Sequence, residues 1–236
     1  MDNKLDYNKY INEPEYDMTL ANFLKYHKRY PVIAITGQPW IGKSTISREL
    51  TELLWASLYT ELPENNINLK IIKETKWKVN DITLWGNNQN YFLATDINQI
   101  TEAFIVSKKQ PIVLDFALTQ PFIFSDMKLK GTWLTTFNSM YKNQFKSLPK
   151  PDIIIELRAD SSVLIERLER RWKHIDEFVV KMIENMWKYY KSWIVKEHYE
   201  DLNTKVIEIN NNINVWPEEI KEQVINSILE QIKKAS

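Results

Sequence analysis

The chain has 236 residues, 44% of them hydrophobic and 26% charged, with a formal net charge of +0. This length and composition suit one large α/β domain, and the balanced charge argues against a partner that is a nucleic-acid polymer or an anionic membrane. The lack of cysteine excludes disulfides and thiolate chemistry, and the three histidines are too far apart for a transition-metal site. No stretch of eighteen apolar residues occurs, so we expect a soluble, cytoplasmic protein.

The first thirty residues are expected to form a polar arm and a short helix. Asp17 and Thr19 are alternative N-caps for this helix, which must end before Pro31. An apolar run at 32–36 then predicts the first strand. We therefore divide the chain into an arm at 1–30 and a main domain at 31–236.

A glycine-rich loop follows this strand and has the pattern GxxxxGK[ST] of a phosphate-binding loop. Its glycines let backbone N–H groups turn toward a phosphate, and a helix expected from about Lys43 to Leu62 would point its positive end at the same anion. Lys43 would reach the β- and γ-phosphates and Ser44 would ligate Mg²⁺, so we predict ATP and Mg²⁺ as cofactors. The alternative is a glycine turn that ends a strand and binds nothing. The predicted cofactor-binding residues are Gly37, Gln38, Pro39, Trp40, Ile41, Gly42, Lys43, Ser44 and Thr45.

Four more strands are expected to alternate with helices after the loop. The strands are predicted at 70–74, 110–115, 151–157 and 205–210, and the helices at 88–107, at 119–146, from about 161, at about 176–198 and from 216. This alternation predicts a parallel sheet. The expected fold class is α/β, a P-loop three-layer αβα arrangement with a five-stranded parallel sheet and a helical lid. Ligands of such sheets bind at the carboxyl ends of the strands.

Acidic residues end two of the predicted strands. Asp115 would hold Mg²⁺ directly or through water, unless it is only a turn residue or a helix cap. Glu74 would face the γ-phosphate and accept the proton of an attacking hydroxyl, unless it is only a charged strand end. We therefore assign Asp115 to the metal, together with Ser44, and Glu74 to general-base catalysis.

A basic segment follows the fourth strand and is predicted to form a lid at about 165–178. Guanidinium groups stabilise the charge on a transferring phosphoryl group, and a lid would deliver them when substrates are bound. We assign this role to Arg167 and Arg171, while Arg170 and Lys173 extend the cluster. The alternative is a solvated helix face.

Aromatic residues near the expected acceptor site are candidates for stacking on a base or a sugar ring. Core packing explains them equally well. They are Trp77, Trp85, Tyr91 and Phe116.

The order of these motifs resembles the deoxynucleoside kinase family, in particular its bacterial deoxyadenosine and deoxyguanosine kinases. Lys73-Glu74 looks like the second-strand Lys-Glu-Pro motif of the family, and the segment 89–93, Gln-Asn-Tyr-Phe-Leu, is similar to the family helix whose glutamine pairs with the base. Asp115 falls at the start of the family motif (D/E)-R-(S/T). The segment 165–171 looks like the lid, and the loop 210–216 falls where the family holds the adenine of ATP.

This resemblance implies Mg²⁺-assisted phosphoryl transfer from ATP to the 5′-hydroxyl of a (deoxy)nucleoside, with Glu74 as the base and Gln89 in the substrate site. Thr75 and Phe116 stand where the family has the motif proline and arginine. Two alternatives stay open. One is a nucleoside monophosphate kinase-like enzyme. The other is a weakly active nucleotide-binding subunit that pairs with an active homologue, and Phe116 favours this second alternative. The expected partners are a small-molecule nucleoside or nucleotide and a second chain, in a homodimer or a heterodimer with a homologue.

Overall fold

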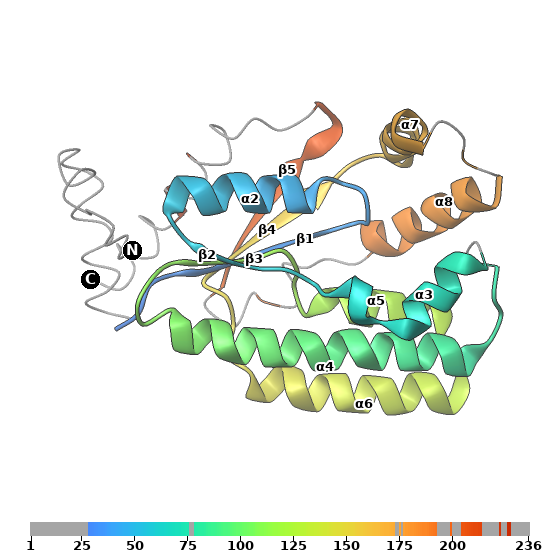
Figure 1. Ribbon diagram of the computed structural model, residues 1–236, viewed down its shortest axis with the longest axis horizontal. Coiled ribbons are helices and arrows are strands. Elements are labelled where there is room, and N and C mark those ends of the chain that lie inside the picture. Colours follow the sequence, from blue (N-terminus) through green and yellow to red (C-terminus); the bar gives the residue numbers. More distant parts are fainter. Residues whose placement is uncertain are drawn as a thin grey trace.

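The computed structural model describes residues 28–75, 78–172, 175, 177–192, 199, 204–213, 222, 226 and 227. The helix expected before Pro31, Trp77, parts of the predicted lid and most of the helix expected from 216 lie outside these residues. Figure 1 shows the described elements around one central sheet. Within the part of the chain so described, no helix is both long and apolar enough to cross a membrane.

Five parallel strands form this sheet in the order β2-β3-β1-β4-β5. Ala34 of the central strand is level with Leu114 on one side and with Ile154 on the other. Because all the strands run the same way, their carboxyl ends meet at one edge, and the α/β fold class is confirmed. The strands are β1 (Val32–Gly37), β2 (Ser57–Tyr59), β3 (Ile112–Leu114), β4 (Ile153–Arg158) and β5 (Lys205–Asn210).

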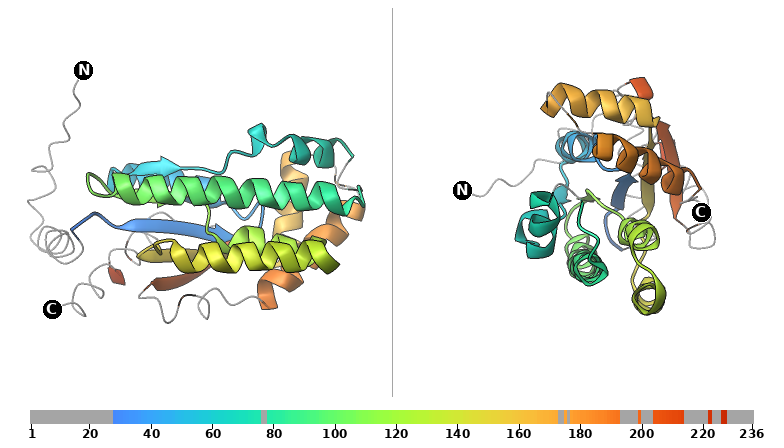
Figure 2. Two further views of the ribbon diagram at one scale, coloured as in Figure 1. Left: turned by 90° about the horizontal axis from the view of Figure 1, so that it is seen from below. Right: turned by 90° about the vertical axis from the view of Figure 1, so that its right-hand side faces the viewer.

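Helices cover both faces of the sheet, as the end-on view in Figure 2 shows. Alternate side chains of β4 enter different cores: Ile155 packs in the core that includes residues of α2, α7 and α8, while Ile154 packs with residues of α4 and α6. The helices are α2 (Lys43–Leu54), α3 (Ile67–Glu74), α4 (Ile82–Val106), α5 (Thr119–Lys128), α6 (Gly131–Ser147), α7 (Ser161–Trp172) and α8 (Glu177–Ser192); η2 (Pro63–Asn65) and η4 (Asn211–Ile213) are short 3₁₀ helices.

The helix after the glycine-rich loop is shorter than predicted. It ends at Leu54, because Trp55 adopts a left-handed conformation with φ of 51°. The backbone N–H groups of Trp55 and Ala56 then bond back to carbonyl groups of the last turn. This early end makes room for β2, so the second strand lies at 57–59.

The strand predicted at 70–74 is wrong, because these residues belong to helix α3. The side chain of Asn66 accepts hydrogen bonds from the N–H groups of Asn68 and Leu69 and so caps this helix. Leu69 and Ile72, three positions apart, are its buried residues, which is helical spacing. The short β-branched run Ile71-Ile72 had indicated a strand.

Two other helices differ from the predictions at their ends. Helix α4 starts six residues earlier than expected because Asp81 caps it, accepting hydrogen bonds from the N–H groups of Thr83 and Leu84. The segment at 119–146, expected to be mostly helical, consists of α5 and α6, which are separated by an extended stretch at Leu129 and Lys130. The third, fourth and fifth strands lie within the predicted ranges, apart from one added residue at the end of β4.

Candidate functional site

The glycine-rich loop connects β1 to α2 at the carboxyl edge of the sheet. Gly37 has φ of 144°, and a Cβ atom there would lie 2.6 Å from the carbonyl oxygen of Leu157. Gly42 has φ of 103°, also in the left-handed region. Both positions therefore require glycine. Trp40 has φ of 66°, which is unusual for a bulky residue and places strain at this loop.

Lys43 and the start of helix α2 complete an anion-binding cradle. The ammonium group of Lys43 lies 3.3 Å from the carbonyl oxygen of Gly37, across the mouth of the loop. Helix α2 has twelve residues, and among the described residues no side chain caps its first turn. Its unpaired N–H groups and positive end favour a phosphate group. Ser44 and Thr45 are exposed at this same end.

Two acidic residues lie at the carboxyl edge beside the loop. Asp115 follows β3, is buried, and is within 3.0 Å of the hydroxyl of Ser47 on α2. Glu61 follows β2 by two residues and is half-buried. Burial raises the pKa of Glu61 to about 7, the charge of Lys43 opposes this shift, and the charge of Asp115 adds to it. Glu61, Lys43 and Asp115 therefore lie in one electrostatic site.

Glu74 does not belong to this group. It is exposed at the end of α3 rather than at the end of a strand, so the argument that made it a general base was wrong. Glu61 has the position that the sequence analysis assigned to Glu74: a carboxylate just beyond the second strand, within the field of the lysine. The signal that could have revealed it was Pro63, because a proline after an apolar segment marks the end of a strand.

Of the predicted lid residues, the structure brings Arg167 to the loop. Its guanidinium group donates hydrogen bonds to the carbonyl oxygens of Ile41, at 3.3 Å, and Asn211, at 2.6 Å. Burial lowers the pKa of this guanidinium group. Arg167 thus ties α7 to the loop and to the end of β5. Arg170 instead forms an exposed ion pair with Glu166, and the side chain of Arg171 lies outside the described part of the structure.

The predicted substrate residues have different surroundings. Gln89 is buried on α4, and Tyr91 donates a 3.0 Å hydrogen bond to the carbonyl oxygen of Leu62, next to Glu61. Trp85 is buried and donates to the carbonyl oxygen of Val79. The ring of Phe116 is fully buried in the core formed with α4 and α6. Phe116, a predicted substrate residue, therefore lies in the core of the protein.

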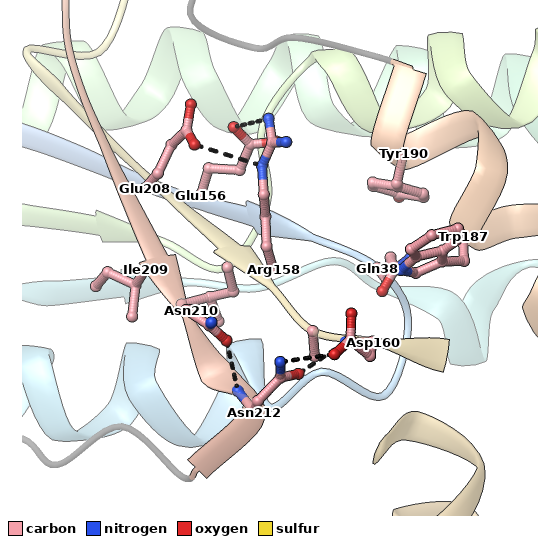
Figure 3. A pocket seen from close by; sticks show the side chains of 12 residues that line it. Gln38, Glu156, Arg158, Asp160, Trp187, Tyr190, Glu208, Ile209, Asn210 and Asn212 are labelled. Carbon is pink, nitrogen blue, oxygen red and sulfur yellow. Dashed lines mark hydrogen bonds and ion pairs between the residues drawn. The ribbon is translucent and has the colours of Figure 1, made fainter. Parts of the chain in front are cut away.

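A cavity of about 430 Å³ opens at the carboxyl ends of β4 and β5, beside Gln38 of the loop. In Figure 3, Glu156 and Glu208 flank the guanidinium group of Arg158, at 3.1 and 3.8 Å. Burial raises the pKa of Glu156 to about 7, although the hydrogen bond from Arg158 opposes this shift. The sequence analysis did not identify this charged cluster.

Tyr190 of α8 connects this cavity to the site of Glu61. Its side chain lines the cavity, and its hydroxyl has no hydrogen-bond partner within the described residues. Burial raises the pKa of this phenol, and the charges of Glu61 and Glu156 add to the effect. The cavity thus lies beside Gln38 of the loop, and Tyr190 in its lining is within electrostatic range of both Glu61 and Glu156.

The residues present suit a magnesium ion that arrives with a nucleotide. Within the described ranges, no group of three or more His, Cys, Asp or Glu side chains could hold a metal. Mg²⁺ commonly binds to one or two carboxylates, with substrate phosphates and waters completing its octahedron. The hydroxyl of Ser44 at the start of α2 and the carboxylate of Asp115, which is linked to α2 through Ser47, are hard oxygen ligands of the kind that Mg²⁺ binds.

A glycine-rich loop between the central strand and the next helix, with a lysine at the helix start, is the phosphate site of a P-loop kinase fold. The sequence profile described as Deoxynucleoside kinase matches residues 33–234. This protein belongs to the deoxynucleoside kinase family.

Individual relatives are more distant. The chain is 26% identical over 150 residues to the deoxyguanosine kinase of Bacillus subtilis (strain 168). The matched segment covers 62% of this chain and 70% of the Bacillus protein. It is also 26% identical over 203 residues to a protein of Thermococcus kodakarensis provisionally named an adenylate kinase, 86% of this chain and 88% of that one. The deoxyadenosine kinase from M. mycoides with bound dATP has a TM-score of 0.65 at 22% identity, covering 83% of this chain and 99% of that chain. The similarity to this solved structure, at 22% identity, shows a shared fold only.

Proposed function

We propose that this protein transfers the γ-phosphoryl group of ATP to the 5′-hydroxyl of a (deoxy)nucleoside. The observation that carries the proposal is the group formed by Lys43, Glu61 and Asp115 beside the glycine-rich loop. It combines a cation for the phosphates, a carboxylate with a pKa near neutrality and a second carboxylate for a metal. Phosphoryl transfer to a hydroxyl needs these three functions.

In this proposal Glu61 takes the proton of the attacking hydroxyl. A base whose pKa is about 7 is well matched to this task near neutral pH. The 5′-oxygen forms a bond to the γ-phosphorus, and the bond between that phosphorus and the β–γ bridging oxygen breaks to release ADP. Lys43 and the N–H groups of the loop stabilise the phosphate charge, and Arg167 holds the loop in shape through the Ile41 carbonyl.

Mg²⁺, held by Ser44 and Asp115, would neutralise charge on the phosphate oxygens. The relatives support a nucleotide at this site, because the M. mycoides deoxyadenosine kinase has been solved with dATP and with dCTP. The name of the Bacillus subtilis relative supports a nucleoside acceptor.

A nucleoside monophosphate is the second candidate acceptor, favoured by the likeness to the Thermococcus protein. The charges in the structure favour the nucleoside. Buried Asp96 lies in the electrostatic field of Glu61, so a second acidic group lies near the proposed general base. In its ionised form, which is the form that accepts a proton, Glu61 would repel the phosphate of a monophosphate acceptor, whereas an uncharged nucleoside avoids this cost.

The test is a panel of nucleosides and nucleoside monophosphates incubated with the protein, ATP and Mg²⁺, with product analysis. We expect 5′-monophosphates from at least one nucleoside, and Lys43→Ala should abolish both Mg·ATP binding in calorimetry and turnover. Lys70→Ala, on the exposed side of α3, is the matched control and should change neither. Turnover with monophosphates alone, or Mg·ATP binding with no turnover on any acceptor, would contradict the proposal.

A further inference from the structure

The carbonyl oxygen of Ile41 in the glycine-rich loop accepts hydrogen bonds from two side chains that are distant in the sequence. The side-chain amide of Asn211, which follows β5, donates at 2.6 Å, and the guanidinium group of Arg167 on α7 donates at 3.3 Å. Arg167 also donates a 2.6 Å hydrogen bond to the backbone carbonyl oxygen of Asn211. The three residues therefore form a closed triangle that joins the loop to α7 and to the end of β5.

Asn211 packs directly against the last peptide of the loop. Its side chain is buried, and a Cβ atom on Gly42 would lie 3.6 Å from its side-chain nitrogen. The carbonyl oxygen of Gly42 accepts the first hydrogen bonds of α2, from the N–H groups of Thr45 and Ile46. The peptide between Ile41 and Gly42 is thus the point at which the loop becomes a helix, and its rotation would break the hydrogen bond from Asn211.

The orientation of this peptide decides where one N–H donor of the loop points. In a trans peptide the carbonyl oxygen and the N–H hydrogen point in opposite directions. Because the carbonyl of Ile41 points to Asn211 and Arg167, the N–H group of Gly42 points away from them. Phosphate-binding loops hold an anion with N–H groups that turn inward. The direction of the Ile41 carbonyl therefore sets the direction of a donor that the anion needs.

A second contact holds the segment that carries Asn211. The N–H group of Asp160 donates to Oδ1 of Asn212 at 2.8 Å, and Nδ2 of Asn212 donates to Oδ2 of Asp160 at 2.9 Å, as Figure 3 shows. Asp160 directly precedes α7, and Oδ1 of Asn210 accepts a 3.0 Å hydrogen bond from the N–H group of Asn212. The side chains of three consecutive asparagines therefore hold this segment against the loop and the start of α7.

We propose that Asn211 is a positioning residue for the phosphate donor. By holding the Ile41 carbonyl, it turns the N–H group of Gly42 toward the phosphates and so sets the affinity of the loop for a triphosphate. Of the two donors to this carbonyl, Arg167 belongs to the segment that we predicted as a lid, whereas Asn211 is buried at the end of a strand. The inference rests on the proposed function, because it assumes that the phosphates of Mg·ATP occupy the loop.

The test compares Mg·ATP with Mg·tripolyphosphate, which has three phosphates but neither sugar nor base, in calorimetric titrations. In Asn211→Ala we expect Kd to rise by about tenfold, an effect that the loss of one hydrogen bond can produce. The factor should be the same for both ligands, because the change lies in the loop. A loss confined to Mg·ATP would overturn the proposal, since Asn211 would then act on the sugar or the base. Unchanged Kd values would overturn it as well.

A second variant separates the missing donor from a packing defect. Asn211→Leu keeps the volume of the buried side chain without its N–H groups, and it should weaken both ligands as much as Asn211→Ala does. Asn66→Ala is the matched control, because Asn66 is another buried asparagine whose side chain bonds to backbone groups, at the start of α3. It should lower the midpoint of thermal unfolding without changing either Kd. An equal loss of phosphate affinity in Asn66→Ala would mean that only stability is affected.

Asp160→Ala tests whether the hydrogen bond to Ile41 is the contact that matters. This variant removes the carboxylate that Asn212 contacts but keeps the hydrogen bond from Asn211 to Ile41. It should leave the Kd of Mg·tripolyphosphate unchanged, and a loss equal to that in Asn211→Ala would contradict the proposal. In steady-state kinetics, Asn211→Ala should raise KM for ATP and leave KM for the nucleoside unchanged, a split that a general structural defect would not produce.

This inference and the proposed function fail in different ways. If the unchanged protein binds Mg·ATP and Mg·tripolyphosphate but phosphorylates no nucleoside, the proposed function is wrong, and the binding data still decide the role of Asn211. If nucleosides are phosphorylated but Asn211→Ala binds both ligands normally, the inference alone is wrong. Binding of Mg·ATP without binding of Mg·tripolyphosphate by the unchanged protein would also contradict the inference, because the loop would then not hold the phosphates by itself.

Discussion

The hydroxyl of Ser47 lies 3.0 Å from Oδ1 of Asp115 and joins helix α2 to the residue that follows β3. It also lies 2.8 Å from the carbonyl oxygen of Lys43, so its single proton is shared between these two acceptors. Both side chains are buried. Ser47 therefore fixes the orientation of the carboxylate that we assign to Mg²⁺, and it acts as a positioning residue.

Ser47→Ala should raise the Mg²⁺ concentration needed for half-maximal activity by about tenfold, because hydrogen-bonding partners of metal ligands typically contribute 10–100-fold to affinity. The rate at saturating Mg²⁺ should change much less. Ser107→Ala is a matched control, since Ser107 is another buried serine that bonds to a backbone carbonyl of α4, at the opposite edge of the sheet. If both variants shift the Mg²⁺ dependence alike, Ser47 has only a structural role.

Glu61→Gln should lower turnover by about 10²-fold or more with little change in ATP affinity, because the amide keeps the shape of the side chain and removes the base. Glu74→Gln is the decisive comparison and should retain full activity, since Glu74 is exposed at the end of α3. Steady-state rates and calorimetric ATP binding measure the two effects. A loss confined to Glu74→Gln would restore the role that the sequence analysis gave to Glu74.

The pH dependence of activity provides a second measurement on Glu61. Its pKa is raised to about 7, and the base must be ionised to accept a proton. The kcat/KM value should therefore rise with pH through about 7 and level off above it. A profile that is flat between about pH 6 and 8 would contradict this assignment of the base.

Most of the fold was predictable because its signals are local. The apolar runs of β1, β3 and β4 are buried on both faces, so they differ clearly from the amphipathic helices between them. The edge strand β5 is recognisable by alternation instead, with Ile207 and Ile209 buried and Glu208 and Asn210 exposed. Strand β2 was missed because it has three half-buried residues and follows α2 after a turn of two residues. The strand predicted at 70–74 was wrong because a short apolar run such as Ile71-Ile72 does not distinguish a strand from a helix by its periodicity.

The site was predictable where the chemistry is contained in one segment. The segment Gly37–Thr45 encodes its own geometry through its glycines and Lys43. Glu61, Asp96 and Tyr190 come from three distant segments, and their importance depends on burial and on their mutual electrostatic effects. Such properties arise when the chain folds, so residue type and spacing alone did not reveal them.

Glu156 should make stability depend on pH. Its pKa is raised from the ordinary value of 4.5 to about 7, so the folded state binds this proton more tightly than the unfolded state does. The contribution of Glu156 to stability is therefore fully present below about pH 4.5 and decreases as pH rises to about 7, by about 3 kcal/mol. Urea unfolding at pH 5 and pH 8 should show a larger decrease for the unchanged protein than for Glu156→Gln. Glu184→Gln, exposed on α8, should behave like the unchanged protein.

Phe116→Arg tests how far a family motif can be transferred without the structure. On the sequence alone, Phe116→Arg would restore the arginine that the family motif (D/E)-R-(S/T) has at this position. In the structure the ring of Phe116 is fully buried among apolar side chains such as Leu114 and Ile100. An arginine there would place an unpaired charge in the core, which costs several kcal/mol.

We therefore expect Phe116→Arg to lower the free energy of unfolding by about 3 kcal/mol or more and to reduce the yield of folded protein. Phe116→Leu, which keeps the site apolar, should cost about 1 kcal/mol and retain activity. Thermal or urea unfolding together with rates per folded molecule measures both effects. Wild-type stability and higher turnover in Phe116→Arg would mean that the guanidinium group escapes the core and reaches Glu61 and Asp115.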